Sequence, residues 1–482
     1  MSESIAEMVI PGTYIEVRAE GLIAVGAIAT GNIGIVGTAG RGPVNAVRAI
    51  GSLAEAIDLY GLPDPFEDAR VEDSPLTLVR ALEQAYLGGA RNVFAVRAAN
   101  GNRTAASLDI RAAGNLDGFT LTARGIVDDL TGTEIEGSSG TWGRDIHVDV
   151  SPDTTTTPAR SRLTISYRNL REVFVGATVG ELHTAAGAST LVSVGDVENA
   201  GLAVVPVSGN LTGGTDGADV SAGDLGDALA ELEDQPVNIL LVAGVGTDVI
   251  GNVVAGQLER TENEGRERIA VLGARDSGTA SAASGVEQDA EATADDRIVL
   301  VAPGLRAVDT ASDRDVVLPP AYLAAVVAGR LSTLAPHVSL TNKVLPVTPD
   351  VKYSTALTQR LLDMRVLLVR QKFGAQIVKG ITSSPPPFTQ ISIRRTVDYA
   401  KAGVRLGADP YLGRLNNTRV RAALKATLDG FFSQMVLDEM LVSYQLDVSA
   451  TRAQERAGIC TVVMTLRPTF SIDFIRVTMN LE

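Results

Sequence analysis

The residues that most often carry catalysis are few and scattered in this sequence. It contains only three histidines, His147, His183 and His337, each in a separate context, and one cysteine, Cys460. No second histidine or cysteine stands at metal-ligand spacing, and no GxSxG, HExxH, CxxC or Walker motif occurs. The tripeptide DSG at 276–278 lacks the glycine that precedes a nucleophilic serine. The sequence therefore predicts no catalytic residue, no metal site and no cofactor.

Two glycine-rich turns are candidates for phosphate binding, because the backbone amides at the start of a helix can hold an anion. The first, GNIGIVGTAGRGP at 31–43, fits neither a dinucleotide fingerprint nor a Walker A loop. In the second, Gly244 and Gly246 follow an apolar run and precede a helical pattern, but Gly251 is displaced and Val249 holds the fingerprint position. A cytosolic α/β enzyme with a nucleotide-binding loop at Gly244–Gly251 is therefore the alternative function.

Composition narrows the class of protein. The chain has 482 residues, of which 45% are hydrophobic and 21% charged, as in folded proteins of roughly three domains. Its net charge of −15 argues against nucleic acid or an anionic membrane as partner. Cys460 lies in an apolar run and is predicted to be a packed small hydrophobe. Without a secretion signal or an 18-residue apolar window, the sequence predicts a protein assembled in the cytoplasm, without membrane insertion.

Alternating helical and buried-strand patterns predict an α/β layer in two pieces. Continuous apolar strands of this kind lie in sheets that are covered on both faces. The expected strands are 33–36, 92–97, 237–243, 268–272 and 297–302. The expected helices are 53–60, 74–87, 224–232, 248–262 and 319–331.

Residues 101–215 differ in character from the pieces on either side. Thr, Gly, Ser and Asp dominate, short alternating strands recur, and helical patterns are absent. This stretch predicts a β-rich domain inserted into the α/β layer. The following C-terminal region combines both element types, with helices expected at 356–373 and 419–441 and strands at 375–381 and 390–395.

Charge is distributed unevenly along the chain. Residues 216–300 hold 18 acidic against 5 basic side chains, whereas residues 351–435 hold 14 basic against 4 acidic ones. Opposed patches of this kind can serve head-to-tail self-association or bind an acidic partner. They can also be solvated faces without a function.

Both ends of the chain have apolar extended patterns. Near the N-terminus, Pro11 and Gly12 exclude a helix, and the residues that follow predict a strand around Tyr14, Ile15 and Val17. Near the C-terminus, 459–466 is an apolar strand, and Pro468 separates it from a second, alternating one. The apolar residues of this second strand are Phe470, Ile472, Phe474, Ile475, Val477, Met479 and Leu481.

The alternation of the last strand slips by one residue between Phe474 and Ile475. In an extended strand, such a slip sends the later side chains to the opposite face. A terminal apolar strand has to join some sheet, because an unpaired edge is a template for another chain. The strand is either an edge of the protein's own sheet or an arm that completes a neighbouring subunit's sheet.

Several stretches in order along the whole chain resemble contractile tail sheath proteins. These proteins form the sheaths of contractile-tailed phages, R-type pyocins and phage-tail-like injection systems. The stretches that carry the resemblance are PGTYIEV at 11–17, TGNIGIVGTAGRGPVNAVRAIGSLAEAIDLYG at 30–61, PPAYLAAVVAGRLSTLAPHVSLTNKVL at 319–345, KFGAQIVKGITSS at 372–384, ISIRRTVDYAKAGVR at 391–405, DPYLGRLNNTRVRAALKATLDGFF at 409–432, and the final strand pair.

The resemblance implies a multidomain α/β fold with a subtilisin-like core and no protease activity, since the Asp-His-Ser motif is missing. The implied parts are an N-terminal arm at 1–24, the core at 25–100 and 216–355, an inserted β-rich domain at 101–215, an α+β C-terminal domain at 356–467, and a C-terminal arm at 468–482.

The resemblance also implies a structural function and its partners. Subunits would form hexameric rings stacked into a helix around an inner tube protein, with baseplate and cap or terminator proteins at the ends. The arms would cross to neighbours, and contraction would drive the tube through a target envelope. The implied particle is a phage tail or an injection particle, released by lysis. The basic helix near Arg419, Arg421 and Lys425 would face the tube.

Overall fold

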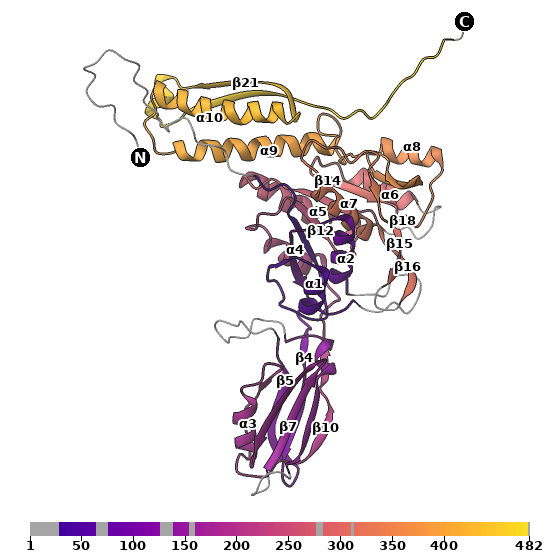
Figure 1. The fold of residues 1–482 in the computed structure, drawn as a ribbon, viewed down its shortest axis with the longest axis vertical. Helices are drawn as coiled ribbons and strands as arrows, with labels where there is room; N and C mark the ends of the chain where they lie inside the picture. The colour runs from indigo at the N-terminus through magenta and orange to yellow at the C-terminus, as the bar shows by residue number, and fades with distance from the viewer. Residues whose placement is uncertain are drawn as a thin grey trace, which may run out of the picture.

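The computed structural model describes residues 28–63, 76–125, 138–153, 160–275, 283–309 and 313–480. The predicted N-terminal arm with Tyr14, Ile15 and Val17, the predicted helix start at Ser74, and Leu481 lie outside these ranges. The described chain forms three parts along one long axis: a β-rich module, an α/β body, and a C-terminal layer from which the tail extends (Figure 1).

The body is built on a nine-stranded sheet whose central strands are parallel. The strand order is β17-β20-β19-β14-β13-β12-β1-β3-β2, and β2, β20 and β17 at the ends pair in antiparallel fashion. The strands are β1 (Ile33–Thr38), β2 (Arg48–Ile50), β3 (Val93–Ala98), β12 (Ile239–Val242), β13 (Ile269–Gly273), β14 (Ile298–Ala302), β17 (Val344–Leu345), β19 (Leu367–Lys372) and β20 (Gly374–Ile377).

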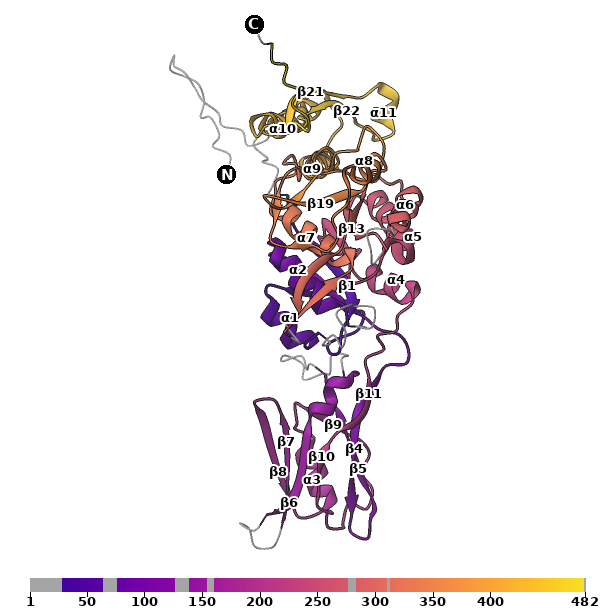
Figure 2. The same cartoon turned by 90° about the vertical axis from the view of Figure 1, so that its right-hand side faces the viewer.

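Helices cover both faces of this sheet, as the continuous apolar strands predict (Figure 2). Along β12, Ile239 and Leu241 face the layer of α1, α2 and α7, whereas Leu240 and Val242 face α4 and α5. Helices α6 and α8 extend the second layer over β14 and β19. The helices are α1 (Leu53–Tyr60), α2 (Leu78–Gly88), α4 (Ala222–Ala230), α5 (Thr247–Asn263), α6 (Ala283–Ala292), α7 (Pro320–Ser332) and α8 (Thr355–Asp363).

Helices α2 and α7 touch backbone to backbone. A Cβ atom on Gly88 would lie 2.3 Å from the carbonyl oxygen of Val326, and one on Gly329 would lie 2.1 Å from that of Ala85. Glycine at both positions is therefore what permits this approach. Beside them, a small sheet of β15 (Leu305–Asp309), β16 (Arg314–Leu318) and β18 (Thr348–Pro349) closes the same side of the body.

The β-rich module consists of two four-stranded sheets around one core. One sheet has the order β10-β6-β7-β8 and the other β11-β4-β5-β9. Its elements are β4 (Thr104–Ala112), β5 (Leu116–Ala123), η3 (Thr141–Asp145), β6 (His147–Asp153), β7 (Arg160–Tyr167), β8 (Leu170–Gly176), α3 (Val179–Ala186), β9 (Val192–Val194), β10 (Val207–Asn210) and β11 (Thr212–Thr215). Helix α3, which Thr178 caps, is not predicted from the sequence.

The module joins the body through one narrow base. The entering and leaving strands meet there, because the Asn100 amide donates to the carbonyl of Gly217 at 2.8 Å. The fully buried Arg97 of β3 donates to the carbonyls of Gly42, Ser139 and Asp216, which belong to the body, the module and the returning strand. One guanidinium thus fixes three segments at the base.

The C-terminal layer holds two long helices and a two-stranded sheet. Its elements are α9 (Ile391–Ala408), η5 (Asp409–Tyr411), α10 (Thr418–Leu437), β21 (Leu441–Ser449), α11 (Arg452–Arg456) and β22 (Thr461–Pro468). Helix α10 lies between α9 and the β21–β22 sheet (Figure 1). The predicted helix at 419–441 is confirmed, but it ends at Leu437, about one turn earlier than expected.

Two predictions for this region are wrong. The expected helix at 356–373 ends at Asp363, and Leu367–Lys372 is strand β19, because Arg365 adopts a left-handed backbone with φ of 67° that breaks the helix. The expected strand at 390–395 is the start of α9. The sequence QISIRR alternates between apolar and polar residues like a strand, but both of its arginines, Arg394 and Arg395, are buried along with the isoleucines.

Candidate functional site

Helix α9 is attached to the body mainly through charged side chains. Arg394, Asp398, Lys401 and Arg405 lie on one face of the helix and meet residues of α5 and of the segments that directly precede β13 and β14. We call this set, with its body partners Glu262, Glu267, Asp296 and Arg297, the charged interface.

Arg297 is the centre of the charged interface. Its side chain is only 3% exposed, and it binds both oxygens of Glu262, at 2.8 and 2.7 Å, and both oxygens of Asp398, at 2.9 and 3.1 Å. Arg394 adds bonds of 2.9 Å to Asp296 and 2.7 Å to Asp398. Bidentate pairing of this kind is the strong form of a charged hydrogen bond.

The pKa values of the charged interface follow from these contacts. Hydrogen bonds from Arg297 and Lys401 lower the pKa of Glu262 to about 2, against the opposing effect of burial. Burial raises the pKa of Asp398, although the hydrogen bonds from Arg297 act in the opposite direction. Glu262 is therefore ionised at any physiological pH.

The charged interface explains part of the uneven charge distribution in the sequence. Lys401 and Arg405 from the basic segment bind Glu262 and Glu267 from the acidic segment, so the opposed charges meet within one chain. Arg360 likewise pairs with Glu287 on α6. Part of the charge expected to mediate self-association or binding of an acidic partner is therefore used in holding α9 on the body.

The opposite side of α9 packs against α10 through aromatic rings. Tyr399 stacks on Phe431 with ring centroids 5.7 Å apart, and Phe431 sits on Gly403, where a Cβ atom would lie 2.0 Å from the ring. On the far side of α10, Phe432 packs on Tyr444 of β21 at 5.3 Å. Helix α10 is therefore held from both sides.

The β21–β22 sheet has two unpaired edges. Within the described residues these strands pair only with each other, from Leu441 opposite Pro468 to Ser449 opposite Thr461. One face packs on α10 through alternate residues such as Leu446 and Met464, which remain partly exposed. A two-stranded sheet is marginal alone, and its free edges can each accept a further strand.

The tail after β22 joins no sheet of its own chain within the described residues, and its last part projects from the molecule (Figure 1). This arrangement excludes the edge-strand alternative for the described tail. The exposed side chains of the expected arm are Phe470 (63%), Ile472 (79%), Phe474 (83%), Ile475 (83%), Val477 (73%) and Met479 (85%). Six large, solvent-exposed apolar side chains within ten residues mark a segment that binds another surface.

The three basic residues of α10 that were expected to face the tube differ in how exposed their side chains are. Arg419 and Lys425 are exposed, whereas the Arg421 side chain is 14% exposed and pairs with Glu455 of α11 at 3.0 Å. Arg421 also donates to the Asn416 side chain at 2.8 Å. The structure therefore places Arg421 inside the domain, where it supports α11.

The glycine turn at 244–251 is filled by the chain's own atoms. A Cβ atom on Gly244 would lie 2.5 Å from Thr77 and 3.0 Å from the Tyr322 hydroxyl, and one on Gly246 would lie 3.0 Å from Arg275. Gly246 also bridges to Gly273 in the neighbouring strand. Glycine at these two positions therefore allows the turn to pack closely against Thr77, Tyr322 and Arg275.

The histidines and the cysteine are not brought together. His147 contacts Asn210, and His183 contacts the carbonyl of Gly195. Cys460 is exposed, which corrects the prediction of a packed residue, because it lies just before β22, in a two-stranded sheet that packs on α10 with only one face. Among the described residues, no group of His, Cys, Asp or Glu has the geometry of a metal site, and no helix is both long and apolar enough to cross a membrane.

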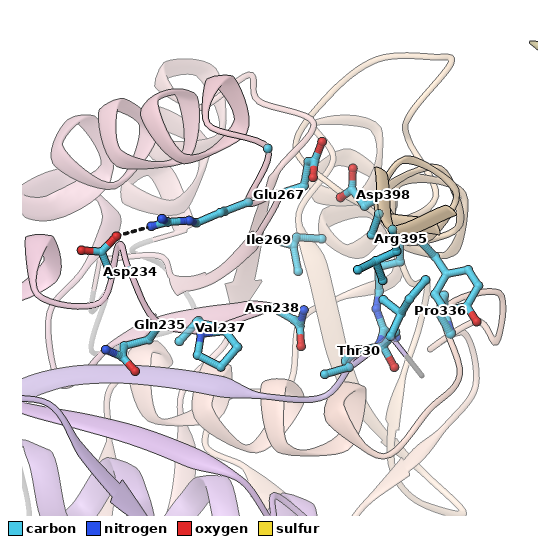
Figure 3. Close-up of a pocket in the computed structure, with 18 residues that line it drawn as sticks. Thr30, Asp234, Gln235, Val237, Asn238, Glu267, Ile269, Pro336, Arg395 and Asp398 are labelled. Carbon is cyan, nitrogen blue, oxygen red and sulfur yellow. Dashed lines mark hydrogen bonds and ion pairs between the residues drawn. The ribbon is translucent and has the colours of Figure 1, made fainter. Parts of the chain in front are cut away.

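A cavity of about 440 Å³ lies between α9 and the body (Figure 3). Arg395, Asp398 and Tyr399 line it from α9, and Asn238 and Glu267 line it from the body. The Arg395 guanidinium points to its edge and donates to the carbonyls of Thr30 and Leu334 at 2.9 and 3.1 Å. The first described residues of the chain, Ile28–Thr30, also line this cavity.

Comparison with known proteins places these features in a family. Residues 383–482 match the model of the phage tail sheath C-terminal domain. The tail sheath protein of Mycobacterium phage Bxz1 is 23% identical over 278 residues, which cover 54% of this chain and 46% of that protein. The match thus spans about half the length of the curated relative.

Solved structures of sheath proteins share the fold over nearly the whole chain. The sheath tail protein of Desulfitobacterium hafniense has a TM-score of 0.64 at 15% identity, covering 95% of this chain and 100% of that one. The helical sheath of the anti-feeding prophage, in its contracted state, has a TM-score of 0.56 at 13% identity, covering 99% and 100%. Residues 383–482 thus match the phage tail sheath C-terminal domain, and the chain as a whole shares the fold of solved sheath proteins.

Proposed function

We propose that the protein is the structural subunit of a contractile sheath. It polymerises helically around an inner tube and contracts to drive the tube through a target envelope. The observation that carries this proposal is the exposed apolar tail beside a two-stranded sheet whose outer edges are unpaired among the described residues. A tail that its own chain leaves unpaired, and edges that can accept strands, together make a self-complementary pair for polymerisation.

The arms supply the connection between subunits. The C-terminal arm adds a strand to one edge of a neighbour's β21–β22 sheet, and the N-terminal arm, with Tyr14, Ile15 and Val17, adds one to the other edge. Two free edges match two arms in number. Contacts of this kind are made by main-chain hydrogen bonds, so they persist while the subunits rotate relative to one another.

The body and the module have separate roles in this proposal. The α/β body, residues 25–100 and 216–355, is subtilisin-like in fold, and the module at 101–215 is an insertion whose two ends meet at Asn100 and Gly217. The C-terminal domain covers 356–467 and the arm 468–482. We assign no enzymatic activity, because contraction releases free energy stored in the lattice during assembly and needs no nucleotide.

The partners follow from the sheath architecture. The subunits form hexameric rings stacked in a helix, with baseplate and cap or terminator proteins at the ends. Arg419 and Lys425, exposed on α10, remain candidates to face the tube. Arg421 acts indirectly by holding α11. The particle is assembled in the cytoplasm and released by lysis.

Electron microscopy of the purified full-length protein tests the proposal. We expect helical tubes at high concentration or in the presence of the tube protein. Deletion of residues 468–482 should leave a folded subunit that forms no tubes. Small closed oligomers alone, under all these conditions, would contradict the sheath function, and tubes formed by the truncated chain would contradict the role of the arm.

A further inference from the structure

The first residues of the C-terminal tail are fixed to their own subunit. The Asp473 side chain is 11% exposed and accepts hydrogen bonds from Thr341 and Gln390, each at 3.2 Å, and from Ser471 at 3.1 Å. The ammonium group of Lys379 lies 4.0 Å from the Asp473 carboxylate. The Ser471 amide in turn donates to Gln390 at 3.4 Å.

These contacts tie the tail to the body and not to its own two-stranded sheet. Thr341 precedes β17 and Lys379 follows β20, so both belong to the edge of the nine-stranded sheet. Gln390 is the residue at which α9 begins. The tail therefore crosses the junction of body and C-terminal layer, and a pull on it reaches the body directly.

The fixed segment turns its polar side chains inward and its apolar ones outward. Ser471 and Asp473 are partly buried, whereas Phe470, Ile472 and Phe474 are 63%, 79% and 83% exposed. This is the reverse of the usual arrangement, in which a strand buries its apolar face. The subunit thus holds an apolar row in a fixed orientation without covering it.

We propose that Asp473 is a clasp that presents Phe470, Ile472 and Phe474 as a pre-ordered ridge for a second copy of this chain. The free arm begins only at Ile475. This inference rests on the proposed sheath function and adds that the C-terminal arm has two contact surfaces. The occupant is a second copy because the ridge continues directly into the arm that reaches one.

The slip in the apolar pattern lies where the clasp ends. In an extended chain, two apolar rows face opposite sides: the first is Phe470, Ile472 and Phe474, and the second is Ile475, Val477 and Met479. One flat surface cannot bury both rows. The ridge and the free arm therefore contact different surfaces, and Asp473 fixes the angle between the subunit and the point at which its arm departs.

Spin-label distances test the clasp in the isolated subunit. Cys460 is exposed and is the only cysteine of the sequence, so Ile475→Cys gives a defined label pair. We expect a narrow distance distribution that broadens on Asp473→Ala and on Gln390→Ala. Asp363→Asn, which removes an exposed carboxylate at the end of α8, should leave it narrow. An equally narrow distribution in Asp473→Ala would overturn the clasp.

The fraction of protein that assembles into tubes tests whether the ridge contacts a second copy. Asp473→Ala keeps every apolar side chain of the arm, yet we expect the fraction of protein in tubes to fall at least about tenfold, the effect of losing one charged hydrogen bond that holds the ridge within its own subunit. Asp363→Asn should assemble like the wild type. Tubes of normal yield from Asp473→Ala would overturn the ridge and leave the sheath function standing. A wild type that forms no tubes would contradict that function itself.

Discussion

Single arginines hold together segments that lie far apart in the sequence. Arg97 joins three carbonyls at the base of the module, Arg395 joins the carbonyls of Thr30 and Leu334, and Arg297 joins α5 to α9. A planar guanidinium with five donors is suited to such junctions, and lysine is not an equivalent replacement. These residues could not be identified from the sequence, because their partners are mostly backbone oxygens without a sequence signal.

Replacing Arg297 should destabilise the protein strongly. Arg297→Met leaves the carboxylates of Glu262 and Asp398 without their main partner, and we expect a loss of about 3–5 kcal/mol in the free energy of unfolding. Arg260→Met is the matched control, because Arg260 pairs with Glu233 at the surface and its side chain is 56% exposed. That change should cost less than about 1 kcal/mol. Chemical denaturation followed by circular dichroism measures both, and equal effects would contradict the central role of Arg297.

The charged interface should also make stability depend on pH. The pKa of Glu262 is about 2 in the folded protein, below its ordinary value of 4.5, so the folded state binds the proton more weakly than the unfolded state. The stabilisation is therefore complete above pH 4.5 and is lost as the pH falls from 4.5 towards 2. Thermal unfolding at a series of pH values should show this loss in the wild type and a shallower slope in Glu262→Gln. If the stability of the wild type and of Glu262→Gln changed with pH in the same way, Glu262 would not be the source of this pH dependence.

At the scale of elements, the parallel strands and most helices of the body could be predicted, because their apolar runs and caps are local signals. The strand at Leu367–Lys372 and the start of α9 could not. The first depends on Arg365 adopting a left-handed backbone, which arginine rarely does. The second depends on acidic partners about a hundred residues earlier, such as Asp296 for Arg394. The apolar tail was predicted as an arm, but the clasp at Asp473 was not, since Thr341 and Lys379 carry no signal of their own.

Two glycines of the C-terminal layer should respond oppositely to the same substitution. Gly403→Ala forces the Phe431 ring away from α9 and should cost about 1–3 kcal/mol. Gly430→Ala lies on the open side of α10, with no other atom within 4 Å, and should stabilise the helix by up to about 1 kcal/mol. Thermal unfolding distinguishes the two. A stabilising Gly403→Ala would show that α9 and α10 are less closely packed than described.

At the scale of the whole molecule, the module should be removable. Its entering and leaving strands meet at Asn100 and Gly217, so a two-glycine link can replace residues 101–216. Arg97 must be changed to methionine in the same variant, since two of its three acceptors, Ser139 and Asp216, leave with the module. We expect a folded body that still forms tubes of smaller outer diameter by electron microscopy. Loss of tubes from a folded variant would assign the module a part in assembly.

The close approach of α2 and α7 has a mechanical consequence. Where glycine lets two backbones touch, no flexible side chains lie between them that could yield under force. The body should therefore be the stiff part of the subunit. Compliance is left to the tail beyond Ile475, whose described residues join no sheet. If force is applied along the arms in an optical trap, we expect the first extension to come from the tail and the nine-stranded sheet to open last.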